Sequence, residues 1–254
     1  MKPIDRPTEL RDYYRDTTVA DQYMRRRTSE PLNGVLHRRQ VDFLNQALAA
    51  RQPQRVLEIA CGPGRLTTAM RHVHMGVAID SSPAMLETAQ RRMNGAAGQW
   101  SFLRTDAFVL PFQDQVFDAV YTLRFIRHFQ LDERRRLYGE IRRVLRPRGI
   151  FMVDALNHDV SQPYRIKRGV ERYRIYDVLY RAGQIERELS AAGFTVTAVE
   201  GIIRHAAIQR FLNRLRRVKL GRVAAALIAS LEYIPGHQPS GWMLLCEKAD
   251  DTRT

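Results

Sequence analysis

The residues with the clearest chemical potential lie in the stretch RVLEIACGPGRLT, residues 55–67. Residues 56–60 form an aliphatic run of the kind found in a short buried strand, and turn residues end it at once. Gly62 and Gly64 permit backbone angles that other residues resist, and they let a ligand approach the main chain closely. Helical text follows from Arg65. A strand, a glycine turn and a helix start in this order are typical of a site for a nucleotide-like ligand.

Two acidic residues follow the next two strands expected along the chain. Asp80 ends the run GVAID, and Asp106 ends the run SFLRTD. A carboxylate at the first place can accept hydrogen bonds from both hydroxyls of a ribose. One at the second can accept from an adenine amino group, while Ala107 leaves room for the ring. Since open α/β sheets bind ligands at the carboxyl ends of their strands, the pair predicts a nucleoside site beside the glycine turn.

Two other nucleotide sites share this arrangement. A phosphate-binding loop needs Gly-Lys-Ser/Thr, whereas Arg65, Leu66 and Thr67 follow the glycines here. The dinucleotide fingerprint needs a third glycine near position 67 for close helix packing, and Thr67 stands there instead. The sequence therefore excludes a phosphate-binding loop and argues against a dinucleotide site.

The elements that must position these residues alternate between strand and helix after a helical segment of about 50 residues. Such alternation favours a parallel sheet with helices on both faces. Residues 161–178 read as an inserted hairpin because apolar and polar residues alternate there. A long amphipathic stretch at 204–231, interrupted at Gly221, precedes the last strand. We expect strands at 55–60, 76–80, 101–105, 117–122, 149–154, 194–200 and 241–248, and helices at 82–93, 132–145 and 181–192.

With these motifs the chain resembles the class I S-adenosylmethionine-dependent methyltransferases, in particular the group that acts mostly on small molecules. The likeness rests on VLEIACGPGRLT, VAIDSSPAMLETAQRR, FLRTDAFVLPFQDQVFDAVYTLRFIRHF and LYGEIRRVLRPRGIFMVDALN, and extends more loosely over 180–248. It implies an α/β, Rossmann-like fold whose seven-stranded, mostly parallel sheet has an antiparallel last strand and helices on both faces. It also implies an N-terminal helical lid at 1–50 and a methyltransferase domain at 51–254, with a helical insertion at about 203–235.

The resemblance implies S-adenosylmethionine as the cofactor. In this family the glycine loop holds the methionine part, the acid after the second strand holds the ribose, and the acid after the third strand meets the adenine. A pocket edged with carboxylates also suits a cationic sulfonium. The cofactor-binding residues carried over are Glu58, Ala60, Gly62, Gly64, Asp80, Ser81, Met85, Asp106, Ala107 and Leu123, with Tyr23 as a candidate lid contact.

The sequence defines the methyl acceptor less sharply. Methyl transfer from a sulfonium rests largely on positioning, and a base helps when the acceptor is a hydroxyl or an acidic carbon. His128, just after the fourth strand, is the candidate catalytic base, and Arg124 and Arg127 could bind an anionic acceptor or be solvated. No metal site is expected. We therefore expect a small-molecule acceptor, an acidic or lipophilic metabolite, and favour O-methylation.

Two alternatives stay open, an RNA methyltransferase with the same cofactor site and a non-catalytic protein that binds the cofactor. Nucleic acid is not the expected partner, since no appended recognition module is evident and the basic residues are not interleaved with aromatic ones. The Asn/Asp-Pro-Pro-aromatic signature of adenine and amide methylation is missing. No Cys lies near the fourth or fifth strand for a covalent route to cytosine.

The chain of 254 residues carries a formal net charge of +14, and only four of its 41 basic residues are Lys. An excess of Arg also arises in GC-rich genomes, so the charge alone does not identify an anionic partner. In the stretch 204–231, apolar residues share one helical face and basic residues lie away from it. Four interpretations fit this stretch: a substrate lid, a dimer surface, a helix lying on an anionic membrane, or a helix that binds RNA.

No apolar run reaches the roughly 18 to 20 residues of a membrane span, and the first residues lack a signal-peptide pattern. We therefore expect a cytoplasmic protein, with a peripheral contact at the inner membrane through 204–231 as one of the interpretations above. The sequence leaves the oligomeric state open.

Overall fold

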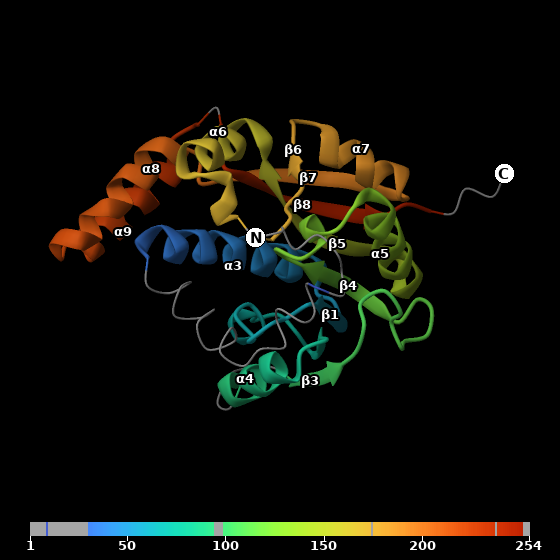
Figure 1. Cartoon of the computed structure of the whole chain (residues 1–254). Coiled ribbons are helices and arrows are strands. Elements are labelled where there is room, and N and C mark those ends of the chain that lie inside the picture. Colours follow the sequence, from blue (N-terminus) through green and yellow to red (C-terminus); the bar gives the residue numbers. More distant parts are fainter. Residues whose placement is uncertain (1–8, 10–29, 94–98, 174, 237, 251–254) are drawn as a thin grey trace.

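The computed structural model of the chain describes Glu9 and residues 30–93, 99–173, 175–236 and 238–250. A twisted sheet crosses the molecule, and helices cover both of its faces (Figure 1). The strands are β1 (Arg55–Ile59), β2 (Met75–Asp80), β3 (Gln99–Arg104), β4 (Phe117–Thr122), β5 (Leu145–Asn157), β6 (Leu179–Tyr180), β7 (Phe194–Ile202) and β8 (Gly241–Lys248). The helices are α3 (Pro31–Arg51), α4 (Pro83–Met93), α5 (Leu131–Val144), α6 (His158–Arg168), α7 (Gln184–Ala191), α8 (Ala206–Leu212) and α9 (Gly221–Ser230). Short 3₁₀ turns are η1 (Thr67–Ala69), η2 (Ile126–His128), η3 (Val170–Arg172), η4 (Asn213–Val218) and η5 (Leu231–Tyr233).

The strand order across the sheet is β3-β2-β1-β4-β5-β8-β7, and β6 pairs with the end of β5. β8 runs antiparallel to both of its neighbours, β5 and β7, whereas the pairs among β1 to β6 are parallel. The carboxyl ends of the first five strands therefore meet at one edge. From β1 the sheet grows first toward β2 and β3, and the chain then crosses back to add β4 and β5 on the other side of β1. Such a switch point opens a crevice at that edge.

The expected α/β sheet with an antiparallel last strand is confirmed, and strands occupy all seven expected places. The sheet gains an eighth strand because β6 joins β5, and a two-residue strand is too short to show a periodicity in sequence. The hairpin expected at 161–178 is wrong. Helix α6 occupies its first half, and the Asn157 side chain caps this helix by accepting from the Asp159 amide at 2.9 Å.

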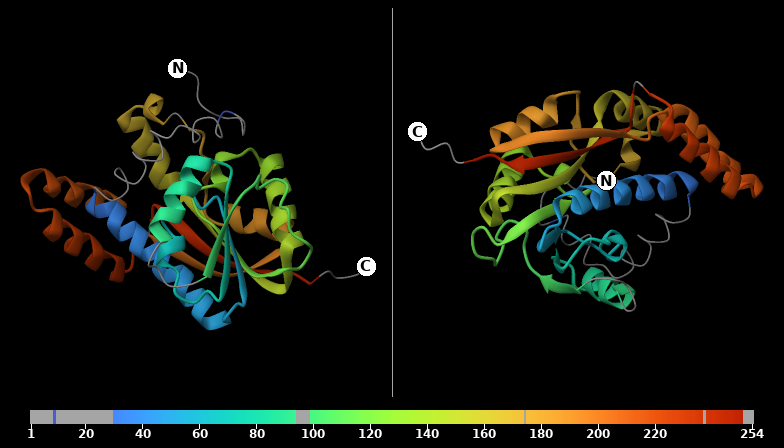
Figure 2. Two further views of the ribbon diagram at one scale, coloured as in Figure 1. Left: turned by 90° about the horizontal axis from the view of Figure 1, so that it is seen from below. Right: turned by 180° about the vertical axis from the view of Figure 1, so that it is seen from behind.

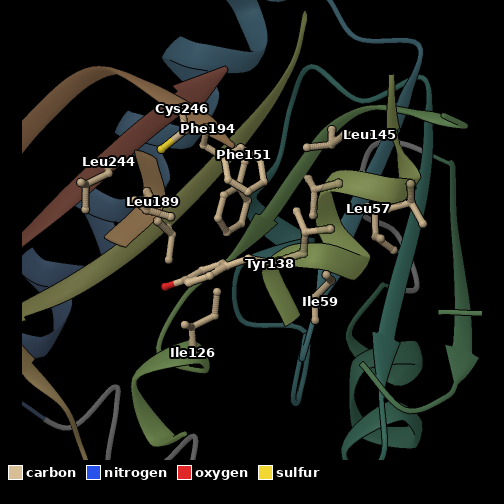
Figure 3. Close-up of a cluster of buried hydrophobic side chains, with 14 of the residues drawn as sticks. Leu57, Ile59, Ile126, Tyr138, Leu145, Phe151, Leu189, Phe194, Leu244 and Cys246 are labelled. Carbon is tan, nitrogen blue, oxygen red and sulfur yellow. The ribbon is translucent and has the colours of Figure 1, made fainter. Parts of the chain in front are cut away.

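Successive residues along the strands pack on opposite faces of the sheet, so both faces are buried. The face under α5 and α7 holds Leu57, Ile59, Tyr138, Phe151, Leu189, Leu244 and Cys246 (Figure 3). The face under α3 holds Phe43, Leu44, Leu48, Val56, Tyr121, Met152 and Met243. Double-sided burial explains why the strands read in sequence as nearly continuous apolar runs.

The connection from β7 to β8 forms a helical hairpin, residues 206–234, instead of one long helix. The chain turns at Lys219, which has a left-handed φ of 62°, and α9 starts at Gly221, where the sequence predicts an interruption. Ala224 and Ile228 on the inner side of α9 pack beside Val35 of α3. Both views in Figure 2 show the hairpin projecting from the body of the protein next to one end of α3.

A buried ion pair joins α5 to α7. Arg134 donates from Nε and Nη2 to the two carboxylate oxygens of Glu188 at 2.7 and 2.6 Å, and from Nη1 to the carbonyl of Phe129 at 2.7 Å. The hydroxyls of Tyr138 and Tyr180 donate to the same carboxylate. Since Arg134 is almost fully buried, its charge depends on these partners for stabilisation.

Glu188→Gln should lower the free energy of unfolding by about 3 kcal/mol, because the buried guanidinium would lose its counter-charge. Urea denaturation measures the difference. Glu87→Gln is the matched control, since Glu87 pairs with Arg91 on the exposed side of α4 and such a pair contributes less than about 1 kcal/mol. Equal effects of the two substitutions would contradict the role assigned to the buried pair.

Candidate functional site

An open cavity lies at the carboxyl edge of the sheet, around the ends of β1, β2, β3 and β4. Together with the open solvent at its mouth it measures about 850 Å³. Ten of the residues singled out in the sequence line it: Ala60, Gly62, Asp80, Ser81, Met85, Asp106, Ala107, Leu123, Arg124 and His128. Glu58 and Gly64 lie off its wall, and Tyr23 lies outside the described residues.

The loop after β1 has an alternating left-handed backbone. Ala60, Gly62 and Gly64 have φ angles of 56°, 55° and 71°. A Cβ added at Gly62 would meet no atom within 4 Å, whereas one at Gly64 would lie 3.0 Å from the Cβ of Ala89. Gly62 therefore keeps the cavity wall open, and Gly64 allows α4 to pack against the loop.

The helix expected from Arg65 is wrong, since only the 3₁₀ turn η1 forms there. The Thr67 hydroxyl donates to the Glu58 carboxylate at 2.6 Å, and the chain becomes extended at Met70 before it enters β2. The loop therefore offers no helix N-terminus to a ligand. Its backbone shape and the neighbouring acids supply the binding groups instead.

Glu58 lies beneath the loop and supports it. Its Oε2 accepts hydrogen bonds from Thr67 Oγ1 at 2.6 Å and from the Tyr121 hydroxyl at 2.8 Å. Burial raises the pKa of Glu58 to about 7; the two hydrogen bonds oppose this rise, and the nearby Asp80 adds to it. Glu58 is therefore a buried carboxyl group beneath the loop whose pKa lies near neutral pH.

Asp80 links the loop after β1 to the start of α4. Its Oδ2 accepts from the Gly62 amide at 2.8 Å, and its Oδ1 accepts from the Ser82 amide at 2.9 Å. Ser82 Oγ in turn accepts from the Met85 amide at 3.3 Å and so caps the start of α4. Burial raises the pKa of Asp80, and its hydrogen bonds to backbone amides limit the rise. Each carboxylate oxygen retains lone-pair capacity for a ligand hydroxyl.

Asp106 also lines the cavity, from the loop after β3. Its Oδ1 accepts from the Phe108 amide at 3.1 Å, a bond that shapes the turn carrying Ala107 into the cavity wall. The ring of Phe108 packs edge-on against Phe129 at 5.1 Å, and Phe125 packs against Phe129 at 4.8 Å. Sequence analysis did not predict this aromatic wall. The Phe residues just after the third and fourth strands could have indicated it.

The segment that contains Tyr176 and Asp177 positions the His128 ring, and sequence analysis did not assign these two residues to the site. The Nδ1 of His128 lies 2.8 Å from the carbonyl of Tyr176 and 3.0 Å from Oδ1 of Asp177. A neutral ring that donates from Nδ1 has Nε2 as its acceptor. His128 can therefore act as a positioned proton acceptor on the cavity wall.

Asp177 also binds two guanidinium groups, since Arg127 Nε lies 3.0 Å from its Oδ1 and Arg165 Nη2 lies 2.5 Å from its Oδ2. Burial alone would raise the pKa of Asp177, but Arg127, His128 and Arg165 together hold it well below its usual range. The carboxylate beside His128 is therefore ionised at neutral pH. The mistaken hairpin at 161–178 concealed this residue from sequence analysis.

In the part of the chain that the structure describes, no group of three or more His, Cys, Asp or Glu side chains is arranged to hold a metal ion.

The raised pKa of Glu58 predicts a pH-dependent stability. Its unfolded pKa is near 4.5, so its stabilising contribution is complete below about pH 4.5 and is lost as the pH rises to about 7. Glu58→Gln retains an oxygen acceptor and does not ionise. It should therefore gain stability relative to the unsubstituted protein across that interval, by up to about 3 kcal/mol above pH 7.

Denaturation at pH 4.5, 6 and 8 measures this gain. Glu87→Gln, an exposed substitution on α4, should not reproduce it. A constant difference between Glu58→Gln and the unsubstituted protein at all three pH values would refute the assignment.

The comparisons with known proteins bear on this geometry. Residues 56–149 match a family described as a methyltransferase domain. The O-methyltransferase rstn1 of Aspergillus nomiae is 31% identical over 124 residues, which are 47% of this chain and 54% of that protein. The demethylmenaquinone methyltransferase of Thermus thermophilus is 36% identical over 106 residues, 41% of this chain and 47% of that protein. The chain spans about half the length of these curated relatives.

Among solved structures, the magnesium protoporphyrin IX methyltransferase from Synechocystis PCC 6803, crystallised with bound SAH, has a TM-score of 0.68 and 16% identity. The match covers 96% of this chain and 100% of that chain, and at this identity it shows the fold. The matched family segment contains the glycine loop, Asp80, Asp106 and His128. Residues 56–149 thus match the methyltransferase-domain family, and the fold of the chain is that of a solved methyltransferase.

Proposed function

We propose that this protein transfers the methyl group of S-adenosylmethionine to a small acidic or lipophilic molecule, with an oxygen as the favoured acceptor. The observation that carries the proposal is one cavity lined by the glycine loop, by Asp80 and Asp106 and by His128, whose Nδ1 lies beside Asp177. Catalysis in the cytoplasm is part of the same proposal, as is a lid formed by the residues before α3. The lid expected at 1–50 is too long, because α3 packs on the sheet as part of the core and contributes no residue to the cavity wall.

The residues around the cavity fit the cofactor. Gly62 leaves open space where any other residue would place a Cβ. The carboxylate of Asp80 would accept hydrogen bonds from the ribose hydroxyls, and Asp106 with Ala107 would bind the adenine. When bound, S-adenosylmethionine supplies a methyl group on a cationic sulfur. Glu58 and Gly64 would hold the loop in shape, and Tyr23 would contact the cofactor from the lid. The remaining residues of the pocket would be Ala60, Ser81, Met85 and Leu123.

His128 supports an oxygen acceptor. A hydroxyl must lose its proton as it becomes methylated, and the imidazole can take that proton at Nε2 while Nδ1 remains bound to the Tyr176 carbonyl and Asp177. Asp177 acts as a positioning residue, because it stabilises the imidazolium that forms. Arg124 lies on the cavity wall, where its positive charge would favour an acidic acceptor.

The relatives support an acceptor of this kind. One is named an O-methyltransferase, and another is named for a demethylmenaquinone acceptor. The apolar and aromatic part of the wall, formed by Phe108, Phe125 and Phe129, would suit a ring or a lipophilic chain in the same cavity.

Substitution of the two loop glycines tests the cofactor site. Gly62→Ala places a methyl group at the cavity wall and strains a left-handed residue, so it should weaken binding of S-adenosylhomocysteine at least about tenfold. Gly64→Ala instead presses on Ala89 and should mainly lower the melting temperature. Isothermal titration and thermal melting separate the two effects. Unchanged binding by a folded Gly62→Ala protein would refute the cofactor assignment.

Turnover tests the acceptor class. The protein would be incubated with methyl-labelled S-adenosylmethionine and cell extract, and label would be counted in organic-soluble, small aqueous, protein and RNA fractions. We expect label in one of the first two fractions. Label in RNA would overturn the proposed acceptor, and tight cofactor binding without label in any fraction would favour a non-catalytic protein.

With the labelled acceptor identified, His128→Ala should lower kcat by about 10²- to 10⁴-fold while the KM for the cofactor changes little. Added imidazole should restore part of the rate, which a merely structural role would not allow. His72→Ala, an exposed substitution away from the cavity, is the matched control. A rate that imidazole cannot rescue would argue against the base.

A further inference from the structure

The helical hairpin at residues 206–234 exposes an unusual share of apolar side chains. Half of the large apolar residues that are exposed in the described part of the chain lie in it: Ile208, Phe211, Leu220, Val223, Leu227, Tyr233 and Ile234. The sequence places Ile208, Phe211, Leu212, Leu215 and Val218 on one helical face. Of these, Leu212 and Leu215 pack inward, against the cluster of Val35 and Ile228, whereas Ile208 and Phe211 are exposed. A surface of this kind marks a binding site more often than a solvated face.

Basic side chains accompany this apolar surface. Arg214, Arg216, Arg217, Lys219 and Arg222 are all exposed on the hairpin. The single acid of residues 206–234 is Glu232, whose buried carboxylate accepts hydrogen bonds from the amides of Ile203 and Arg204 and from the Gln209 side chain. No exposed acid of the hairpin itself therefore offsets the positive charge.

The hairpin is fixed to the body of the protein. Asn213 Oδ1 accepts from the Leu32 amide at 3.0 Å, and Glu30 accepts from Asn213 and Arg216 at 3.1 and 3.0 Å. Arg210 lies 4.0 Å from the ring centre of Tyr164 on α6. These contacts hold α8 and η4 in place, so the exposed residues form a preformed surface.

We propose that the hairpin docks the protein on an anionic membrane surface. Aliphatic side chains such as Leu220, Val223 and Leu227 can enter the boundary between headgroups and acyl chains, while the arginines bind anionic headgroups. A second copy of the chain is a poorer occupant, because it would bring two clusters of five exposed cations together. RNA is also a poorer occupant, since five of the seven exposed apolar residues are aliphatic and only Phe211 and Tyr233 could stack on bases.

The direction of β7 decides at which edge of the sheet the hairpin lies. The hairpin follows the carboxyl end of β7, a strand that runs parallel to β5, so it lies at the same edge of the sheet as the cavity. Docking would therefore bring that edge toward the membrane. The docking inference itself stands without the proposed function, because it needs neither cofactor nor turnover.

Sedimentation of the full chain with vesicles tests the proposal. We expect binding to an equal mixture of phosphatidylcholine and phosphatidylglycerol, weak binding to phosphatidylcholine alone, and loss of binding between about 0.1 and 0.5 M NaCl. Phe211→Ala with Leu227→Ala should weaken binding at least about tenfold. Val109→Ala with Val199→Ala is the matched control, since these residues are 67% and 44% exposed, compared with 63% and 43% for Phe211 and Leu227.

A charge-reversed pair completes the test. Arg214→Glu with Arg217→Glu should abolish binding to the mixed vesicles, whereas Arg71→Glu with Arg181→Glu, exposed elsewhere, should retain most of it. Equal loss in both charge pairs, or in both apolar pairs, would overturn the assignment to the hairpin. Absence of vesicle binding would overturn the proposal outright, in favour of self-association if the Phe211/Leu227 variant dissolves a dimer, or of RNA if the Arg214/Arg217 variant alone loses RNA affinity.

Discussion

One carboxylate joins the segments that form the cavity. Asp80 stands at the end of β2, and its oxygens accept from the amides of Gly62 and Ser82. The first bond fixes a left-handed loop that would otherwise be free to open, and the second fixes the first turn of α4. Because the order of strands switches at β1, these two segments flank the crevice that the topology leaves open. Loss of this one acid would therefore disturb the loop, the helix start and the ligand site together.

The features that the sequence predicted well are those with local causes. Apolar runs buried on both faces fix the strands, Ser82 and Pro83 fix the start of α4, and the glycines fix the loop. The features that it did not predict depend on residues far apart in the chain. The turn after Arg65 is too short for a helix because Thr67 is tied to the buried Glu58. Asp177 meets His128 across 49 positions, and no local pattern encodes that contact.

The distribution of charge explains why the net charge alone is a weak guide to function. Around the core, cations are matched by buried acids, as Arg134 is by Glu188 and Arg127 by Asp177. These pairs organise the fold and the site and leave little charge for a partner. The hairpin is different, because its cations are exposed and its one acid, Glu232, is buried in the hairpin base. The same excess of arginine thus has two separate physical roles in one chain.

The place of β8 has a consequence for how the chain is made. β8 is the last strand in sequence, yet it lies between β5 and β7, and in the described chain β7 pairs with β8 alone. Until residues 241–248 leave the ribosome, the apolar β5 keeps an open edge and β7 has no partner in the sheet. Such an edge is a template for pairing with other chains. A nascent chain of this protein therefore depends on β8 for closure of the sheet.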